Sequence, residues 1–227
     1  MRGEFTQAQL YSRPSGRRDV ELLNLNENFL HKKRMEAALQ AIQDPQEIRL
    51  RIWQELVRAT HDRHHEWRTL VLASAHLSGA PNARTVVLRE ADANLGQLRM
   101  YTDSRSDKVA ELTDQPNALL LFWSKRLSWQ LRVRVSAMVY VTGPQVDSAW
   151  ERVRQSAAAG DYLSPFPPGS ALLSAPASAA THSQASIERH HLAVVEARVE
   201  AIDWLELGRG GHRRAQLGTD IWEWLVP

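Results

Sequence analysis

Cations and hydroxyl groups cluster around the start of one predicted helix. Arg84 and Arg89 lie in the strand-like stretch ARTVVLRE, and Lys108 lies in the first turn of the helix predicted from SDKVAELTDQ. A cation there is unusual, because the helix dipole favours anions at a helix start. Thr102 and Ser106 add hydroxyl groups nearby. Hydroxyls, backbone N–H groups and flexible cations together bind phosphate, so we predict a phosphate site, with ordinary surface charges on a hairpin as the alternative.

A second candidate lies in the long stretch SWQLRVRVSAMVYVTG, where polar and apolar residues alternate. Gln130, Arg132 and Arg134 lie on one face of the predicted strand, opposite Leu131 and Val133. A solvated outer face would explain this pattern. A polar wall against a ligand would also explain it, since the amide of Gln130 suits a ligand that has both donors and acceptors.

Two further patterns have weaker functional interpretations. His61, His64 and His65 in HDRHH could share a helix face, but a metal site needs a further shaped ligand set, so we predict a solvated helix end and no metal. Trp123 and Trp129 alternate with lysine and arginine, the combination that binds single-stranded nucleic acid. The formal net charge is only +2, so nucleic-acid binding is kept as an alternative only.

The elements that position these residues follow from the patterning of the chain. Residues 1–43 are predicted to form an irregular arm and a helix, and a further helix should begin at Pro45 with Asp44 as its N-cap. Strand-like stretches separated by turn signals occupy residues 67–143, interrupted by the helix that Ser106 caps. We predict a helix over residues 145–162, a mobile loop over 163–186, a helix over 186–199 and a strand that ends near residue 208.

Composition limits the class of protein. The chain has 227 residues, enough for one domain with appendages, and no cysteine, which excludes disulfides and fits a cytoplasmic location. No apolar run approaches the roughly 20 residues that span a bilayer. The N-terminal residues lack the apolar region of a secretory signal. The density of strands predicts an α+β, mainly β fold built on a small barrel with flanking helices.

Four motifs occur over residues 67–143: ARTVVLR, MYTDSRSDKVAEL, QPNALLLFW and WQLRVRV. In their order and spacing they resemble the pyridoxamine 5'-phosphate oxidase-like FMN-binding split-barrel family, in a branch whose substrates are mostly undefined. The resemblance implies a six-stranded split β-barrel domain over residues 44–227. It also implies FMN as cofactor, oxidoreductase activity and a homodimer with FMN at its interface.

The resemblance further implies which residues contact FMN. The family's Arg-x-Val-x-Leu strand and the residue after it correspond to Arg84, Thr85, Val86, Val87, Leu88 and Arg89. Its Tyr-Thr pair corresponds to Tyr101 and Thr102, its phosphate element to Ser106 and Lys108, and its Gln-x-Arg to Gln130 and Arg132. The His-Arg element corresponds to His212 and Arg213, which with Arg214 would line the substrate side.

Two departures from the family pattern bear on function. Asp107 stands where the family has a phosphate-binding arginine, so Arg105 or Arg89 would have to compensate. The Tyr-x-x-x-Arg-x-x-x-Ser element that binds pyridoxal phosphate is not present around Trp150 and Arg154. We therefore predict an FMN-dependent oxidoreductase with an unknown substrate. The alternatives are a flavin- or haem-binding protein without turnover and a nucleic-acid-binding barrel.

Overall fold

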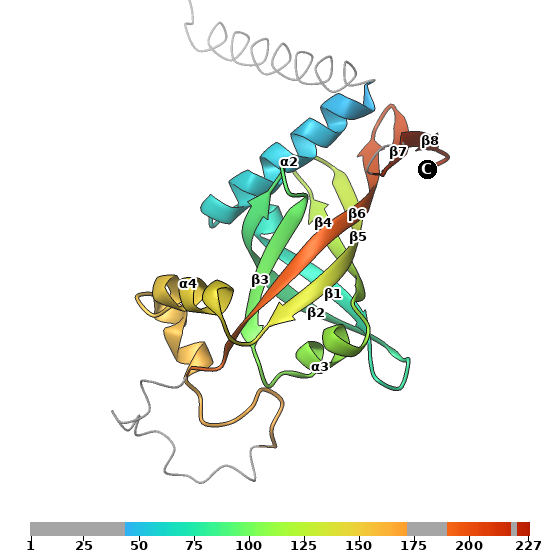
Figure 1. The fold of residues 1–227 in the computed structure, drawn as a ribbon. Helices are drawn as coiled ribbons and strands as arrows, with labels where there is room; N and C mark the ends of the chain where they lie inside the picture. The colour runs from blue at the N-terminus through green and yellow to red at the C-terminus, as the bar shows by residue number, and fades with distance from the viewer. Residues whose placement is uncertain (1–43, 172–189, 219–221) are drawn as a thin grey trace, which may run out of the picture. The chain divides into compact units, whose positions relative to one another are not determined.

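The structure of the chain is a computed structural model that describes residues 44–171, 190–218 and 222–227 (Figure 1). Pro45–Pro227 form one compact unit, distinct from Met1–Asp44. The arm and helix predicted for residues 1–43 lie outside the described residues, as does the part of the predicted loop beyond residue 171. None of the described helices is long and apolar enough to cross a membrane.

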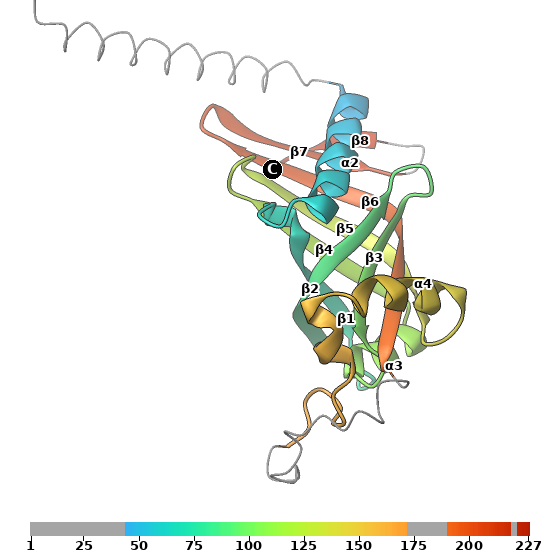
Figure 2. The same ribbon diagram turned by 90° about the vertical axis from the view of Figure 1, so that its left-hand side faces the viewer.

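In the described part of the chain, six antiparallel strands close into a barrel, and two more extend the sheet at one end (Figure 2). The order around the barrel is β3 (Gln97–Asp103), β2 (Pro81–Asp92), β1 (Thr69–Ala75), β4 (Asn117–Ser124), β5 (Trp129–Tyr140) and β6 (Leu192–Gly208). β3 pairs with β6 to close the ring. β7 (Gly211–Leu217) and β8 (Trp222–Leu225) continue from the second half of β6. The predicted mainly β class and six-stranded split barrel are confirmed.

Alternation of apolar residues places one face of each strand in the barrel interior. In β5 the predicted alternation is confirmed, because Leu131 and Val133 are buried whereas Arg132 and Arg134 are exposed. Large rings fill one end of the interior, with centroid separations between 5.3 and 6.5 Å: Trp67, Phe122, Trp129 and Trp204. The strands therefore have a well-filled core, and their outer faces remain available.

Helices cover parts of the barrel. α2 (Pro45–His61) begins at Pro45 as predicted, and its apolar face, which includes Ile48, Ile52 and Leu56, is fully buried. The 3-10 helix η1 (Glu66–Arg68) leads into β1. α3 (Asp107–Asp114), with Ser106 at its N-cap as predicted, lies at the end of the barrel opposite β7 (Figure 1). α4 (Pro144–Val153) and the 3-10 helix η2 (Ala157–Tyr162) pack on the outer side of β6.

The helix predicted for residues 186–199 is wrong in its described part, because Leu192–Gly208 form the strand β6. Ala193 and Val195 are buried on the barrel side, while α4 and η2 cover Leu192 and Val194 on the outer side. A strand that is buried on both faces shows a continuous apolar run rather than alternation. This double burial explains why the sequence pattern favoured a helix.

Candidate functional site

Thr102, Ser106 and Lys108 meet at the start of α3, as the sequence predicted. β3 ends with Thr102 and Asp103, and a short turn leads into α3. Lys108 Nζ donates to Thr102 Oγ1 and to Ser106 Oγ, both at 3.1 Å. Ser106 Oγ also donates to the backbone oxygen of Asp103 at 2.8 Å and makes no capping bond to the helix. The side chain at the N-cap therefore leaves the first N–H groups of α3 uncapped.

No described carboxylate forms an ion pair with Lys108. Its ammonium is half-buried, and its hydrogen bonds within the described residues go to the Thr102 and Ser106 hydroxyls. Burial lowers the pKa of Lys108, and the nearby Arg84 guanidinium lowers it further. Two neighbouring cations, hydroxyl groups and uncapped N–H groups all favour an anion at this place. These residues therefore fit a phosphate group.

Arg84 lies at the same end of the barrel, but a carboxylate already holds it. Its Nη2 is 2.6 Å from Glu111 Oε2, and its Nη1 donates to Ser74 Oγ at 2.5 Å. Ser74 Oγ and Asn82 Nδ2 also donate to Glu111, at 2.6 and 2.7 Å. Burial alone would raise the pKa of Glu111, but the hydrogen bonds from Ser74, Asn82 and Arg84 lower it. Sequence reasoning missed Glu111, because these partners lie 27 to 37 residues away in the chain.

Arg105, which the sequence suggested as a substitute for the family's missing arginine, is held by Asp103 and by backbone oxygens. Its Nη2 is 2.6 Å from Asp103 Oδ2, and its Nε donates to Asp103 Oδ1 at 3.0 Å. The same guanidinium donates to the backbone oxygens of residues 164–166, just after η2. Arg105 therefore ties the segment after η2 to the turn before α3, and its charge is already neutralised.

Arg89 is displaced by a β-bulge in β2. The pairing of β2 with β3 shifts register between Leu88 and Glu90, so Arg89 is an extra residue of the strand. Its guanidinium carbon lies 5.8 Å from the centroid of the Tyr101 ring. Tyr101 Oη donates to Glu90 at 2.8 Å, and burial raises the pKa of Tyr101 to about 12. Neighbouring residues of a strand face opposite sides, so Tyr101 lies on the other face of β3 from Thr102. Arg89 of β2, which lies over the Tyr101 ring, is on that same face.

The remaining predicted flavin contacts divide between the two faces of the barrel wall. The side chains of Val86 and Leu88 are buried in the core, whereas Thr85 and Val87 lie on the outer face. Cross-strand neighbours continue this outer face in two rows, Thr85–Val71–Leu121–Arg132–Asp203 and Trp123–Gln130–Leu205. Every residue in these rows is at least partly exposed. Gln130 and Arg132 thus share a partly apolar outer face with Thr85 and Val87.

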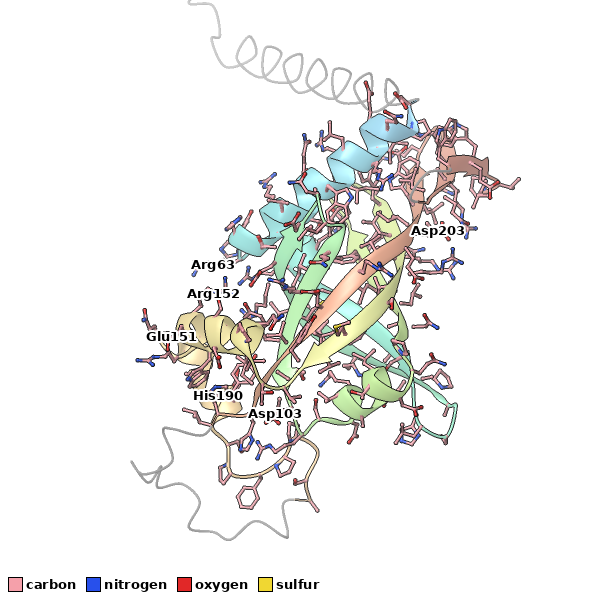
Figure 3. The ribbon with its side chains drawn as sticks, in the orientation of Figure 1. Arg63, Asp103, Glu151, Arg152, His190 and Asp203 are labelled. Carbon is pink, nitrogen blue, oxygen red and sulfur yellow. The ribbon has the colours of Figure 1, made fainter. Side chains whose placement is uncertain are left out.

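Gln130 and Arg132 lie at the barrel end opposite Lys108. Arg132 Nη1 is 3.3 Å from Asp203 Oδ2. Figure 3 places Asp203 and Asp103 toward opposite ends of the barrel, and Asp103 begins the turn before α3. Asp103 pairs with Leu192, the first residue of β6. About 35 Å of extended strand separates Leu192 from Asp203 in the same strand. Within one copy of the chain, the structure does not bring Gln130 to the Lys108 site.

β7 directs its predicted substrate-side residues to two faces. Arg213 Nε donates to the buried Glu206 at 2.7 Å, toward the aromatic core. Arg214 makes two hydrogen bonds to Asp203, at 2.9 and 2.7 Å, on the outer face. His212 is exposed and shares the face of Arg214, because it lies two residues earlier in the strand. The structure therefore brings His212 and Arg214 to one surface and Arg213 to the other.

Two other sequence hypotheses lack support in the structure. α2 ends at His61, and the predicted solvated helix end is wrong for His65, which is buried with its Nε2 2.8 Å from Glu55 Oε2. Within the described residues, no group of three or more His, Cys, Asp or Glu side chains could hold a metal ion. Trp129 is buried and donates to Glu206 at 3.0 Å, so it cannot stack on a nucleic-acid base.

Comparison with known families gives a match over the strands just described. Residues 50–141 match the family described as pyridoxamine 5'-phosphate oxidase, FMN-binding domain. A pyridoxine/pyridoxamine 5'-phosphate oxidase of Thermosynechococcus vestitus is 32% identical over 114 residues, which are 50% of this chain and 51% of that protein. A protein of the same name from Maricaulis maris is 34% identical over 102 residues, 44% and 45% of the two chains. The chain spans about half the length of the curated relatives it matches.

Solved structures share the fold at low sequence identity. A pyridoxamine 5'-phosphate oxidase-related, FMN-binding protein from Nostoc punctiforme aligns with a TM-score of 0.58 and 20% identity, covering 77% of this chain and 95% of that one. PhzG from Burkholderia lata, solved with tetrahydrophenazine-1-carboxylic acid, aligns with a TM-score of 0.61 and 18% identity, covering 82% and 94%. These likenesses show the fold of the described residues, and the activity has to be argued from the site.

Proposed function

We propose that this chain, whose residues 50–141 belong to the FMN-binding domain family of pyridoxamine 5'-phosphate oxidase, is an FMN-dependent oxidoreductase with a substrate other than pyridoxamine phosphate. FMN is the cofactor of this domain family. The observation that carries the proposal is the half-buried Lys108 ammonium, bonded to the Thr102 and Ser106 hydroxyls and unpaired with any described carboxylate. A phosphate dianion would complete this arrangement with charge-assisted hydrogen bonds.

The residues of the chain would divide the work of binding FMN. Lys108, Thr102 and Ser106 would hold the phosphate together with the first N–H groups of α3 and the spare donors of Arg84. The Gln130 amide would bond the polar edge of the ring. When bound, FMN supplies two-electron transfer between a substrate and an acceptor. The partly apolar outer face around Thr85, Val87 and Trp123, with Arg132 at its far end, would shield the ring from water.

The separation of these groups supports a site shared by two copies. Lys108 lies at the α3 end of the barrel. Ala137 of β5 is near the same end, because its N–H donates to the backbone oxygen of Pro116 just after α3. Gln130 precedes Ala137 by about 23 Å of extended strand, toward the other end. A flavin that contacts both groups would therefore take them from different copies. A homodimer and a cytoplasmic location remain predictions from the sequence and belong to the same proposal.

Contacts on α4 support a substrate other than pyridoxamine phosphate. Trp150 stacks on His190 with a ring-centroid separation of 4.3 Å. Arg154 pairs with Glu151 at 3.1 Å (Figure 3 labels Glu151 and His190). Trp150 carries no charge and has a single N–H donor, and the charge of Arg154 is paired with Glu151, so neither side chain offers an unpaired cation to a second phosphate.

Native mass spectrometry and a mixing experiment test the proposal together. We expect a dimer that carries FMN, whose colour bleaches with dithionite and returns in air but does not change on addition of pyridoxamine phosphate. Lys108→Ala and Gln130→Ala should each weaken FMN. In a refolded mixture of the two variants, half of the dimers are mixed and each has one intact shared site, so about a quarter of all sites should regain tight binding.

Three results would each refute one part of this proposal. A dimer whose mixed variants regain no tight sites would exclude the shared site. A protein that neither carries FMN nor binds added FMN would exclude the oxidoreductase itself. Rapid reduction of the flavin by pyridoxamine phosphate, at a rate of order 1 per second or faster, would show that the substrate assignment is wrong.

A further inference from the structure

Glu111 is a buried carboxylate beside a site that we propose to bind an anion. It is only 1% exposed and lies one helical turn after Lys108 on α3. Coulomb repulsion from Glu111 would weaken the binding of a phosphate, and burying a carboxylate also costs free energy of desolvation. A carboxylate at this place therefore needs a compensating role.

The contacts of Glu111 converge on the guanidinium of Arg84. Glu111 Oε2 accepts from Arg84 Nη2 and from Ser74 Oγ, both at 2.6 Å, and Arg84 Nη1 donates to the same Ser74 oxygen at 2.5 Å. Asn82 Nδ2 donates to the other carboxylate oxygen at 2.7 Å. Partners on α3 and β1 thus occupy two of the five donors of Arg84. They set the plane of the guanidinium and leave its other donors for a ligand.

Glu111 also acts on the second cation of the site. Burial and the charge of Arg84 lower the pKa of Lys108, whereas the charges of Glu111 and two aspartates raise it. Without Glu111, two neighbouring cations would repel each other more strongly, and Lys108 would lose its proton more readily. The carboxylate thus favours the charged form of Lys108 and offsets its repulsion from Arg84 before a phosphate arrives.

We propose that Glu111 is a positioning residue for the cofactor phosphate, orienting the Arg84 guanidinium so that Arg84 and Lys108 bind the phosphate together. This inference rests on the proposed function of the Lys108 site. It deepens that function, because it assigns the orientation of a phosphate-binding arginine to a residue that need not contact the cofactor. The competing explanation is that Glu111 only fastens α3 to β1 and β2.

The test compares FMN with riboflavin, which lacks the phosphate, in the full chain and in its variants. Fluorescence titration gives the dissociation constants, and thermal unfolding shows that each variant is folded. We expect Glu111→Ala to weaken FMN about ten-fold or more, the effect of losing a hydrogen bond to a charged group, and riboflavin by less than about three-fold. Glu111→Gln keeps an acceptor for Arg84 once the Asn82 amide turns over, so FMN affinity should stay within about three-fold.

A double variant decides whether Glu111 acts through Arg84. If it does, adding Glu111→Ala to Arg84→Ala changes FMN affinity by less than about two-fold, because the pair is coupled. Equal losses for FMN and riboflavin, or an undiminished loss in the Arg84→Ala background, would overturn the proposal in favour of a fastening role. An unchanged FMN affinity in Glu111→Ala would overturn it as well.

Two further points keep the test decisive. If Glu111→Ala does not fold, Glu111→Asp takes its place, since a side chain that is one methylene shorter cannot hold Arg84 in the same position. Failure of the unmodified chain to bind either flavin would overturn the proposed function and this inference together. Failure of the inference alone would leave tight FMN binding in the unmodified chain.

Discussion

Lys108→Ala should weaken FMN selectively, and the contacts of Lys108 set the size of the effect. A lysine ammonium has three N–H donors, and the hydroxyls of Thr102 and Ser106 take two of them at 3.1 Å. One donor remains for a phosphate oxygen. A hydrogen bond to a charged group contributes about 1.5–3 kcal/mol, so the dissociation constant for FMN should rise about 10- to 150-fold. Binding should persist, because the hydroxyls and Arg84 remain.

Fluorescence titration of FMN and riboflavin at fixed ionic strength measures this effect, since salt screens exposed charges. Riboflavin should bind Lys108→Ala and the unmodified protein alike. Lys125→Ala is the matched control, because Lys125 is exposed in the turn between β4 and β5, and both affinities should stay within about two-fold. Equal losses of FMN and riboflavin in Lys108→Ala would refute the assignment of Lys108 to the phosphate. The unliganded variant should stay folded, because no described carboxylate loses an ion-pair partner.

Two titrating groups give pH-dependent predictions. Burial and the charge of Arg84 lower the pKa of Lys108 below 10.5. As the pH is raised, FMN affinity should therefore begin to fall before pH 10.5 is reached, because Lys108 loses its charge. A pH series of FMN titrations should show this loss in the unmodified protein and not in Lys108→Ala. Burial alone would raise the pKa of Glu55, but hydrogen bonds from His65 and Arg126 lower it below 4.5. A lowered folded-state pKa stabilises the fold above 4.5, and this is lost as pH falls through the folded value. Urea unfolding should therefore show Glu55→Gln destabilising by about 1–3 kcal/mol near neutral pH and progressively less in acid, and an equal loss in both conditions would contradict this.

Features with local causes could be predicted from the sequence. Pro45 at the start of α2 and Ser106 at the start of α3 need only their neighbours in the chain to act as helix signals. The alternation along β5 follows from the strand period alone. The cluster of Thr102, Ser106 and Lys108 was also within reach, because its three members lie within seven residues and one turn brings them together.

Features that depend on distant segments could not be predicted in this way. The sequence pattern of the first part of β6 predicted a helix, because α4 and η2 bury its outer face and remove the alternation typical of a strand. The strand sequence alone does not indicate which segments cover it. The role of Glu111 in α3 could not be predicted, because its partners Ser74, Asn82 and Arg84 lie on β1 and β2. The bulge that displaces Arg89 follows from its pairing with β3, which a single strand does not reveal.

Counting cations in the sequence overstates the charge that this site offers to an anion. The sequence offered Arg84, Arg89, Arg105 and Lys108 for a phosphate, yet Glu111 neutralises Arg84 and Asp103 neutralises Arg105. Arg89, at the β-bulge of β2, lies over the Tyr101 ring. Lys108 makes no ion pair with a described carboxylate, and the hydroxyls it bonds fix where it points. In the proposed site, selectivity for a phosphate would therefore come from the placement of individual donors, since the two ion pairs cancel most of the local positive charge. A net charge of only +2 on the whole chain is compatible with such a site, because a placed donor needs no attractive field around it.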